Sequence, residues 1–258
     1  MKTIRKRSNK RTDSGQILLV AALAVALILT STTVYIYELN ETLSNTEFAS
    51  LNHFVSAVKL GSQHVMIGSL TNISSGGANE TLVENLEKWA SLLERQYKLG
   101  KCTLNFTPLN APPYSSGIWT LWGSDGLGVS SACSNFSFQL SGREVDVKLS
   151  YTINITTTIL VEGSYKVLGG DEKQVNVTCN LLNEGVSALA KNLTLYYESS
   201  GRWLVANSSN NYVLVDYGNG TYCMSFTVNI SLQNVLVSVH AYDQKEIFVR
   251  ANATCTEI

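Results

Sequence analysis

REVDVKLSYTINIT, residues 143–156, is the stretch that decides the fold of this chain. Every second residue in it is apolar, and the residues between them are charged or polar. The apolar set is Val145, Val147, Leu149, Tyr151, Ile153 and Ile155. Successive side chains of a β-strand point to opposite faces of its sheet, so this alternation predicts a long strand with one buried face.

Shorter strands are predicted on both sides of this stretch. The candidates are residues 102–107, 117–122 and 135–140 upstream, and 173–182, 191–198, 202–206, 212–217, 221–230, 234–242 and 246–254 downstream of the turn LGGDE. Turn-forming residues such as SSG, NSSNN and GNG separate the downstream strands, with no helical pattern between them. They predict an immunoglobulin-like sandwich over residues 171–258, preceded by a β-rich region over residues 101–170.

Helical periodicity precedes the strands. Apolar residues recur at spacings of three and four over residues 41–69, which predicts an amphipathic helix. A Gly pair at residues 76–77 ends this pattern. A second helix is predicted from Thr81, which forms a capping box with Glu84, to Gly100. Its apolar face consists of Leu82, Leu86, Trp89, Leu93 and Tyr97.

The N-terminal segment has the charge pattern of a membrane anchor. Residues 1–15 form a basic leader with six of the 19 basic residues, whereas QILLVAALAVALILTSTTVYIY, residues 16–37, carries no charge. As a helix the uncharged segment spans about 33 Å, which matches a bilayer core of about 30 Å. Positive residues flank membrane spans on the cytoplasmic side. We therefore expect a single-pass protein of the cell membrane with a cytoplasmic N-terminus and an extracytoplasmic region after residue 38.

Two other interpretations of this segment are weaker. A cleaved secretory signal has a shorter apolar stretch followed by a small-x-small site, which this segment lacks. A nucleic-acid-binding arm needs no adjacent apolar span, and a net charge of -1 with 15% charged residues argues against a nucleic-acid partner. The predicted partner of the segment is the lipid bilayer.

These elements define the predicted fold class. We expect an α+β chain with a long N-terminal transmembrane and stalk helix and a second amphipathic helix, followed by antiparallel β domains that end in the immunoglobulin-like sandwich. Residues 38–100 are an extracytoplasmic helical stalk or hairpin in this prediction. If the first helix is continuous from residue 16 to residue 69, it forms a rod of roughly 80 Å.

Two stretches resemble known families. The basic leader, Gly15-Gln16 and the apolar run that follows resemble the class III signal of archaeal type IV pilin-like proteins. This resemblance implies cleavage after Gly15, and a helix that anchors the subunit or packs with other pilin-like subunits in a filament. VNVTCNLLNEGVSALAKNLTLYY, residues 175–197, resembles the opening strands of Ig-like domains of the CARDB type on prokaryotic cell surfaces. That resemblance implies adhesion or spacing.

N-glycosylation sequons are the strongest motif signal. Asn-x-Ser/Thr occurs at twelve of the 22 asparagines, whereas the content of Ser and Thr predicts about four by chance. The twelve are Asn40, Asn72, Asn79, Asn105, Asn135, Asn154, Asn176, Asn192, Asn207, Asn219, Asn229 and Asn252. In the predicted strands these asparagines alternate with apolar residues, as Asn154 does with Ile153 and Ile155. An asparagine that alternates with buried residues points toward solvent, where a glycan has to lie. This alternation therefore fits a glycosylated exterior.

Five cysteines after the predicted span indicate an oxidising compartment. Cys102 and Cys133 bracket a segment rich in Pro and Gly. Cys179 and Cys255 are in phase with apolar residues of the first and last strands of the predicted sandwich. We predict disulfides between Cys102 and Cys133 and between Cys179 and Cys255, which leaves Cys223 unpaired, although other pairings stay open.

The sequence contains no motif for catalysis or for a cofactor. G-x-S-x-G, H-E-x-x-H and the P-loop are missing, and GSDGLG at residues 123–128 fits a surface turn. His53 and His64 lie about 16 Å apart on the first predicted helix, too far to share a metal ion.

We therefore expect a non-enzymatic glycoprotein of the cell surface, pilin-like or adhesin-like, with no cofactor and no metal site. In this interpretation it associates with itself or with other pilin-like subunits, and packing of the first helix against the β domain of the same chain is the open alternative. The alternative is a ligand-binding or sensory ectodomain, for which Tyr114, Trp119 and Trp122 are candidates for a sugar-binding platform.

Overall fold

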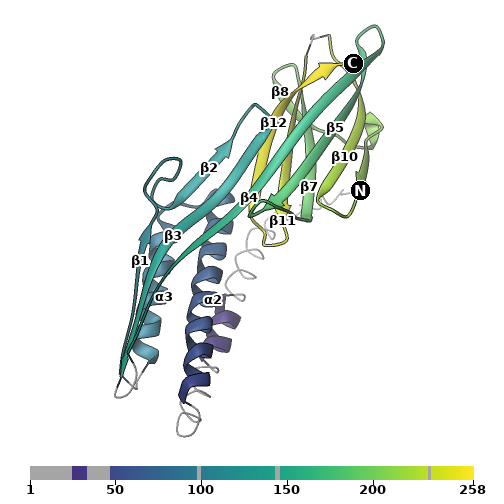
Figure 1. Cartoon of the computed structure of the whole chain (residues 1–258). Coiled ribbons are helices and arrows are strands. Elements are labelled where there is room, and N and C mark those ends of the chain that lie inside the picture. The colour runs from purple at the N-terminus through teal and green to yellow at the C-terminus, as the bar shows by residue number, and fades with distance from the viewer. Residues whose placement is uncertain (1–24, 34–46, 98–99, 143–145, 232–233) are drawn as a thin grey trace, which may run out of the picture.

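The computed structural model describes residues 25–33, 47–97, 100–142, 146–231 and 234–258 (Figure 1). Strands take up 55% of it and helices 25%. The strands are β1 (Gly100–Pro108), β2 (Ile118–Trp122), β3 (Leu127–Gly142), β4 (Asp146–Gly169), β5 (Glu172–Asn183), β6 (Val186–Ser187), β7 (Ala190–Ser199), β8 (Arg202–Val205), β9 (Val213–Asp216), β10 (Thr221–Asn229), β11 (Val235–Asp243) and β12 (Phe248–Glu257). They connect into one twelve-stranded sheet.

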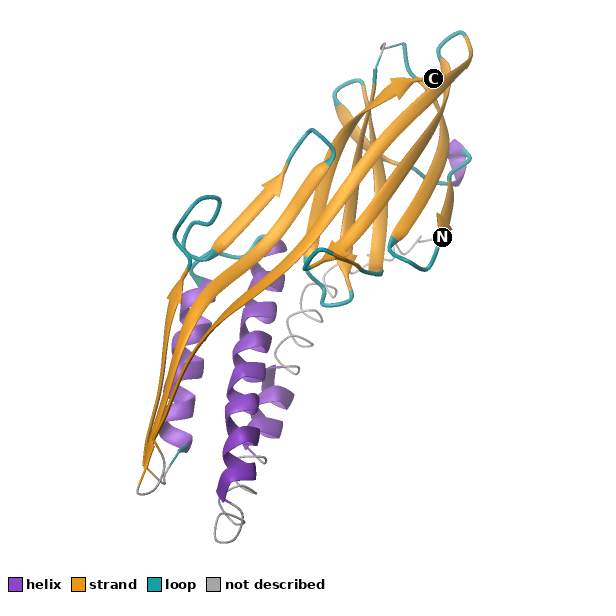
Figure 2. Ribbon diagram, in the orientation of Figure 1, coloured by secondary structure: helices purple, strands orange, loops and turns teal. Residues whose placement is uncertain are grey.

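Two helices cover one face of the first part of this sheet (Figure 2). Helix α2 (Glu47–Ser74) and helix α3 (Thr81–Gln96) form an antiparallel hairpin. Their apolar sides pack with β1, β3 and the first half of β4 into one hydrophobic core. The buried residues of α3 are Leu82, Leu86, Trp89 and Leu93, as the helical periodicity predicts.

A second hydrophobic core lies between two layers of strands. One layer contains β7, β8, β11 and β12, and the other contains β5, β9, β10 and the second half of β4. The rings of Tyr197 on β7 and Phe226 on β10 meet across this core, with centroids 5.3 Å apart. The two layers are joined where β12 pairs in parallel with β4, at Thr256 and Glu257 of β12.

Strand β4 belongs to both cores. It pairs with β3 from Asp146 to Leu160 and with β5 from Thr157 to Gly169, antiparallel in both cases. Gly163 is the position where β4 passes β12, and a Cβ atom there would lie 2.4 Å from Sγ of Cys255. The absence of a side chain at Gly163 therefore lets the two layers approach each other.

The predicted α+β class is wrong, because the structure is mostly β. It has no long N-terminal stalk helix among the residues described: residues 25–33 are helical, and the next described helix, α2, spans Glu47–Ser74. The strands of the predicted sandwich over residues 171–258 enclose the second core together with the second half of β4. They share one sheet with the rest of the molecule through β4, whose alternating pattern continues well past residue 156.

Within the part of the chain that the structure describes, no helix has both the length and the apolar character to cross a bilayer. Most of the predicted span, residues 16–37, and the predicted cleavage position at Gly15 and Gln16 lie outside the described residues. The predicted capping box is wrong as well. Glu80 is the N-cap of α3 in a right-handed helical conformation, without a side-chain cap bond, so Thr81 is already inside the helix.

Candidate glycan-acceptor surface

The sequon asparagines lie on the outside of the molecule. Ten of the eleven that the structure describes are exposed, and Asn252 is half-exposed; Asn40 lies outside the described residues. Of the eight described asparagines without a sequon, four are exposed: Asn52, Asn110, Asn211 and Asn234. Asparagines in sequons are therefore exposed more often than the other described asparagines.

The strand sequons of the first core lie on the face of the sheet opposite the helices. Asn105, Asn135 and Asn154 alternate along β1, β3 and β4 with residues that pack under α2 and α3. Their cross-strand neighbours are mostly small: Asn105 pairs with Ser137, and Asn135 lies between Thr107 and Thr152. Directly opposed side chains lie about 5 Å apart, so small neighbours leave room around the amide.

The second core shows the same arrangement on its outer faces. Asn176 on β5 lies between Ser164 and Ser225, and Asn252 on β12 pairs with Ser238. Two strand sequons have a large cross-strand neighbour instead of a small one: Asn192 pairs with Tyr242, and Asn229 pairs with Glu172.

Within the described residues, no sequon asparagine uses its amide nitrogen, the atom that would carry a glycan, in a side-chain hydrogen bond to another described residue. Where a described sequon asparagine makes a side-chain hydrogen bond, its Oδ1 atom accepts: from Oγ1 of Thr152 at Asn135 (2.7 Å), from the backbone N–H of Ser209 at Asn207 (2.9 Å) and from that of Thr221 at Asn219 (3.0 Å). Asn154 likewise accepts through Oδ1. By contrast, Asn85 and Asn210, which have no sequon, donate from Nδ2.

The predicted disulfide between Cys102 and Cys133 is wrong. Cys102 on β1 pairs with Leu140 of β3, seven residues along that strand from Cys133. At about 3.3 Å per residue this is roughly 23 Å, whereas the Cα atoms of a disulfide lie less than about 7 Å apart. Both residues are buried free thiols, and Cys223 is a half-exposed one.

Cys179 and Cys255 lie in the second core, and each is a free thiol in the structure. Burial raises the pKa of each thiol from 9.0 to about 12. A thiol with a raised pKa stabilises the fold below its unfolded pKa, and this contribution is lost as the pH rises through the folded pKa.

We therefore expect the stability of the reduced protein to fall as the pH rises from about 9 to about 12. The urea midpoint measured across this range tests it, and the fall should be smaller in a Cys179→Ala, Cys255→Ala double variant. If thiol titration of the unfolded protein finds no free Cys179 and Cys255, the 179–255 bridge forms and this pH dependence is absent.

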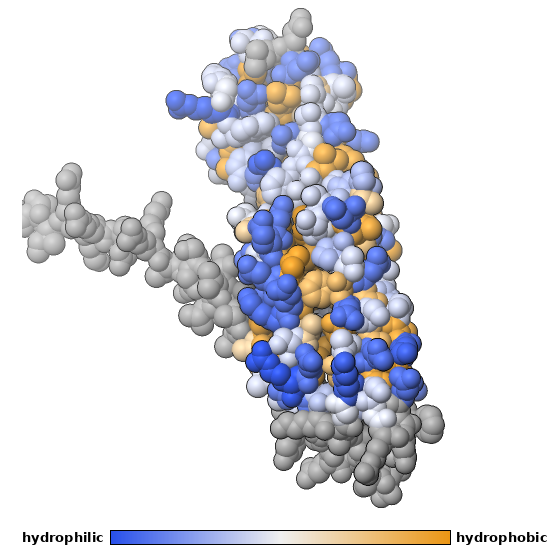
Figure 3. Space-filling view, turned by 90° about the vertical axis from the view of Figure 1, so that its left-hand side faces the viewer, coloured by the Kyte–Doolittle hydropathy of each residue, from blue (hydrophilic) through white to orange (hydrophobic). Residues whose placement is uncertain are grey.

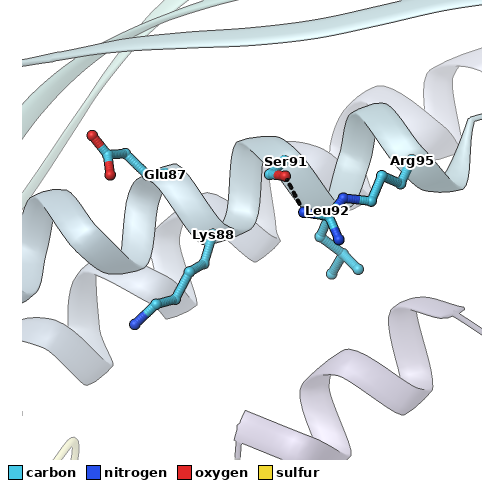
Figure 4. Close-up of a pocket in the computed structure, with 5 residues that line it drawn as sticks. All are labelled: Glu87, Lys88, Ser91, Leu92 and Arg95. Carbon is cyan, nitrogen blue, oxygen red and sulfur yellow. Dashed lines mark hydrogen bonds between the residues drawn. The ribbon is translucent and has the colours of Figure 1, made fainter.

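No arrangement of side chains in the described residues suggests catalysis. No group of three or more His, Cys, Asp or Glu side chains is placed to hold a metal ion within those residues. An open hollow of about 410 Å³ lies along α3, lined by Glu87, Lys88, Ser91, Leu92 and Arg95 (Figure 4). All five residues come from one helix, and the bond from Arg95 to Ser91, 2.8 Å, is a local side-chain contact. The hollow does not bring together groups from different elements.

The three aromatic residues considered as a sugar-binding platform do not lie together. Trp119 and Trp122 are three residues apart on β2, so they point to opposite faces. The ring of Tyr114 contacts that of Trp119, whereas Trp122 packs against Phe248 and under the guanidinium of Arg250. Over the side of the molecule shown in Figure 3, hydrophobic and hydrophilic residues are interspersed.

The segment GSDGLG, residues 123–128, is a turn, as the sequence predicts. It lies against β12: the N–H of Gly126 donates to the carbonyl of Asn252 (2.8 Å), and the N–H of Asn252 donates to the carbonyl of Gly123 (2.9 Å). These bonds join the β2–β3 connection to the second core, which is a structural role.

Strands β8 and β9 end the main path of the sheet, from β8 through β4 to β9, and carry exposed apolar side chains. All residues of both strands are exposed, and the exposed fraction of their apolar side chains ranges from 42% at Leu204 to 54% at Val213. Unpaired edges of this kind tend to associate with other strands. Two sequons lie next to these edges: Asn207 follows β8, and Asn219 is in the turn between β9 and β10. Glycans at these positions would shield the edges.

No protein-family model matches the sequence, and a comparison with curated proteins gives no match.

Proposed function

We propose that this chain is a non-enzymatic, N-glycosylated protein of the cell surface, anchored in the membrane by its N-terminal segment and pilin-like or adhesin-like in role. The observation that carries this proposal is the position of the sequons. Twelve sequons exceed the chance number about threefold, and those in the described residues have outward asparagines with free amide nitrogens. An exposed asparagine does not need a Ser or Thr two residues later in order to fold. Folding alone therefore does not explain why so many exposed asparagines are followed by one.

The charge pattern of the first 37 residues supports the anchor. The basic leader and the uncharged stretch after it are typical of a single span with a cytoplasmic N-terminus. The resemblance to class III signals supports a pilin-like role. The rest of the chain, with net charge -6 after residue 37 (13 basic and 19 acidic residues), lies outside the membrane in this proposal.

The test combines surface proteolysis with glycopeptide mapping. Protease applied to intact cells of the native organism should release peptides from the region after residue 46, and mass spectrometry should find glycans on most of the sequon asparagines. Asn52 and Asn110 are matched controls, because both are exposed and lack a sequon. Failure to release these peptides from intact cells would contradict the topology. Release of unmodified sequon peptides would contradict glycosylation.

A further inference from the structure

Five side chains with aromatic rings gather over β7, β11, β12 and the end of β2. The four from β7, β11 and β12 alternate with buried residues of the second core and therefore point away from it. The ring centroid of Phe248 lies 5.1 Å from that of Tyr242 and 5.4 Å from that of His240. Trp122 of β2 lies 5.4 Å from Phe248, and Tyr196 lies 4.5 Å from His240. These five residues are called here the outer aromatic cluster.

The outer aromatic cluster is open to solvent in part. Tyr242 is 36% exposed, and the other four rings are half-buried. Single exposed apolar side chains are ordinary on a protein surface, whereas a contiguous group of them marks a place where something binds. The rings form such a group on the outside of a strand layer, where the second core does not need them.

Polar groups beside these rings are available to a ligand. No described residue forms a hydrogen bond with the hydroxyl group of Tyr196 or Tyr242, with the ring nitrogens of His240, or with the guanidinium of Arg250. Burial and the charge of Arg250 lower the pKa of His240, so at pH 7 its ring is neutral, with one donor and one acceptor nitrogen. The guanidinium of Arg250 lies over the ring of Trp122, 4.9 Å from its centroid.

This combination of groups selects a class of ligand. Aromatic rings offer flat apolar faces, and the polar groups around them fix the orientation of what lies on those faces. A sugar ring has a face of C–H groups and a rim of hydroxyl groups. The cluster therefore fits carbohydrate better than a purely apolar or a charged ligand.

The sequon asparagine Asn192 stands at the border of the cluster. It is exposed on β7 and pairs directly with Tyr242 of β11, which pairs in turn with Phe248 of β12. The Cβ atoms of directly opposed residues lie about 5 Å apart, so the first sugars of a glycan on Asn192 are within reach of the Tyr242 ring. The sequon Asn176 has Ser164 and Ser225 as neighbours instead.

We propose that the outer aromatic cluster binds the glycan attached to Asn192 of the same chain, with a sugar ring stacked on Tyr242. This inference rests on the proposed glycosylation. The chain's own glycan is the occupant because a short covalent link gives it an effective concentration in the millimolar range at the cluster, which a free sugar has to match from solution. The large neighbour of Asn192, unlike the small neighbours of Asn176, then has a role.

A double-mutant cycle in the full-length protein from its native organism tests the contact. Asn192→Gln removes the glycan, and Tyr242→Thr removes the ring from an exposed strand position. Asn192→Gln alone should raise the equilibrium constant of unfolding about fivefold, which is the size of one aromatic stacking contact. In the Tyr242→Thr background the same change should raise the constant less than about twofold, as independent sites do. Urea unfolding followed by circular dichroism measures both values.

Two further variants serve as controls. Asn176→Gln removes a glycan from another exposed strand position, and its effect should be the same with and without Tyr242→Thr. Tyr242→Phe keeps the ring and loses only the hydroxyl group, so Asn192→Gln should keep most of its effect in that background. If Asn192→Gln has equal effects with and without Tyr242→Thr, the proposal is overturned.

Glycopeptide mapping of the same samples separates this contact from the proposed function. If other sequons carry glycans and Asn192 carries none, the contact is refuted and the glycosylation stands. If every sequon is unmodified, both fail.

The source of the carbohydrate is tested with the glycan released from the protein and added in free form. It should raise the urea midpoint of Asn192→Gln and leave that of the unchanged protein as it is, because the attached glycan already occupies the cluster. An equal rise in both would show that the surface takes carbohydrate from elsewhere, which overturns the proposal.

Discussion

The Phe54→Asp variant is expected to unfold the first core. Phe54 is buried between the rings of Tyr97, 5.6 Å away, and Phe138, 6.0 Å away. A carboxylate in this apolar site has no hydrogen-bond partner and loses its hydration, so the free energy of unfolding should fall by about 4 kcal/mol or more. This is a large share of the stability of an ordinary domain, which is about 5–15 kcal/mol. Urea unfolding followed by circular dichroism measures the change.

Ser56→Asp is the matched control, because Ser56 is exposed two residues further along the same helix. It should change the unfolding free energy by less than about 0.5 kcal/mol. From the sequence alone, the stripe that contains Phe54 and Val58 fits either the core of the monomer or an association surface. The structure shows that it is core. If Phe54→Asp stays folded and only loses oligomers, the helix does not pack as described.

The Asp243→Ala variant is expected to destabilise the junction of β11, β12 and β4 by about 3 kcal/mol. The Asp243 carboxylate is fully buried and accepts three hydrogen bonds: from Oγ1 of Thr157 (2.9 Å) and from the backbone N–H groups of Lys245 (2.9 Å) and Ile247 (2.8 Å). Alanine leaves buried donors without a partner. Thermal unfolding of the purified protein measures the effect.

Asp243→Asn separates the contribution of the hydrogen bonds from that of the negative charge, because asparagine has nearly the same volume. Its Oδ1 atom can still accept from the two backbone N–H groups, and its Nδ2 atom can donate to Oγ1 of Thr157. We expect it to lose less than half of what alanine loses. Equal losses in the two variants would mean that the negative charge, and not the set of hydrogen bonds, stabilises this turn.

Most strand positions follow from local pattern. The predicted strands at 173–182, 191–198 and 221–230 agree within two residues with β5, β7 and β10. Each of these strands has one buried face, so apolar and polar residues alternate along its sequence, and that alternation predicts the strand. The outward phase of the sequon asparagines has the same origin, and it could be predicted for the same reason.

Long-range register could not be predicted in this way. The pairing of Cys102 with Leu140 depends on how β1 aligns with β3 across an intervening strand and two loops, and no local pattern encodes that alignment. The role of Asp243 depends on contact with Thr157, 86 residues away. The continuity of β4 through two cores could not be predicted for a related reason, because it is a property of the sheet and not of any short stretch of sequence.

That continuity determines how the molecule would respond to tension. β4 is 24 residues long and lies along the long dimension of the molecule (Figure 1). A force along this direction shears the backbone hydrogen bonds between β4 and its neighbours β3 and β5, so many of these bonds have to break at once. A force across the strands would break the same hydrogen bonds one after another. Because β4 itself, Asp146–Gly169, connects the two cores, we expect the described strands to resist extension along this direction, with no flexible segment between the cores within β4.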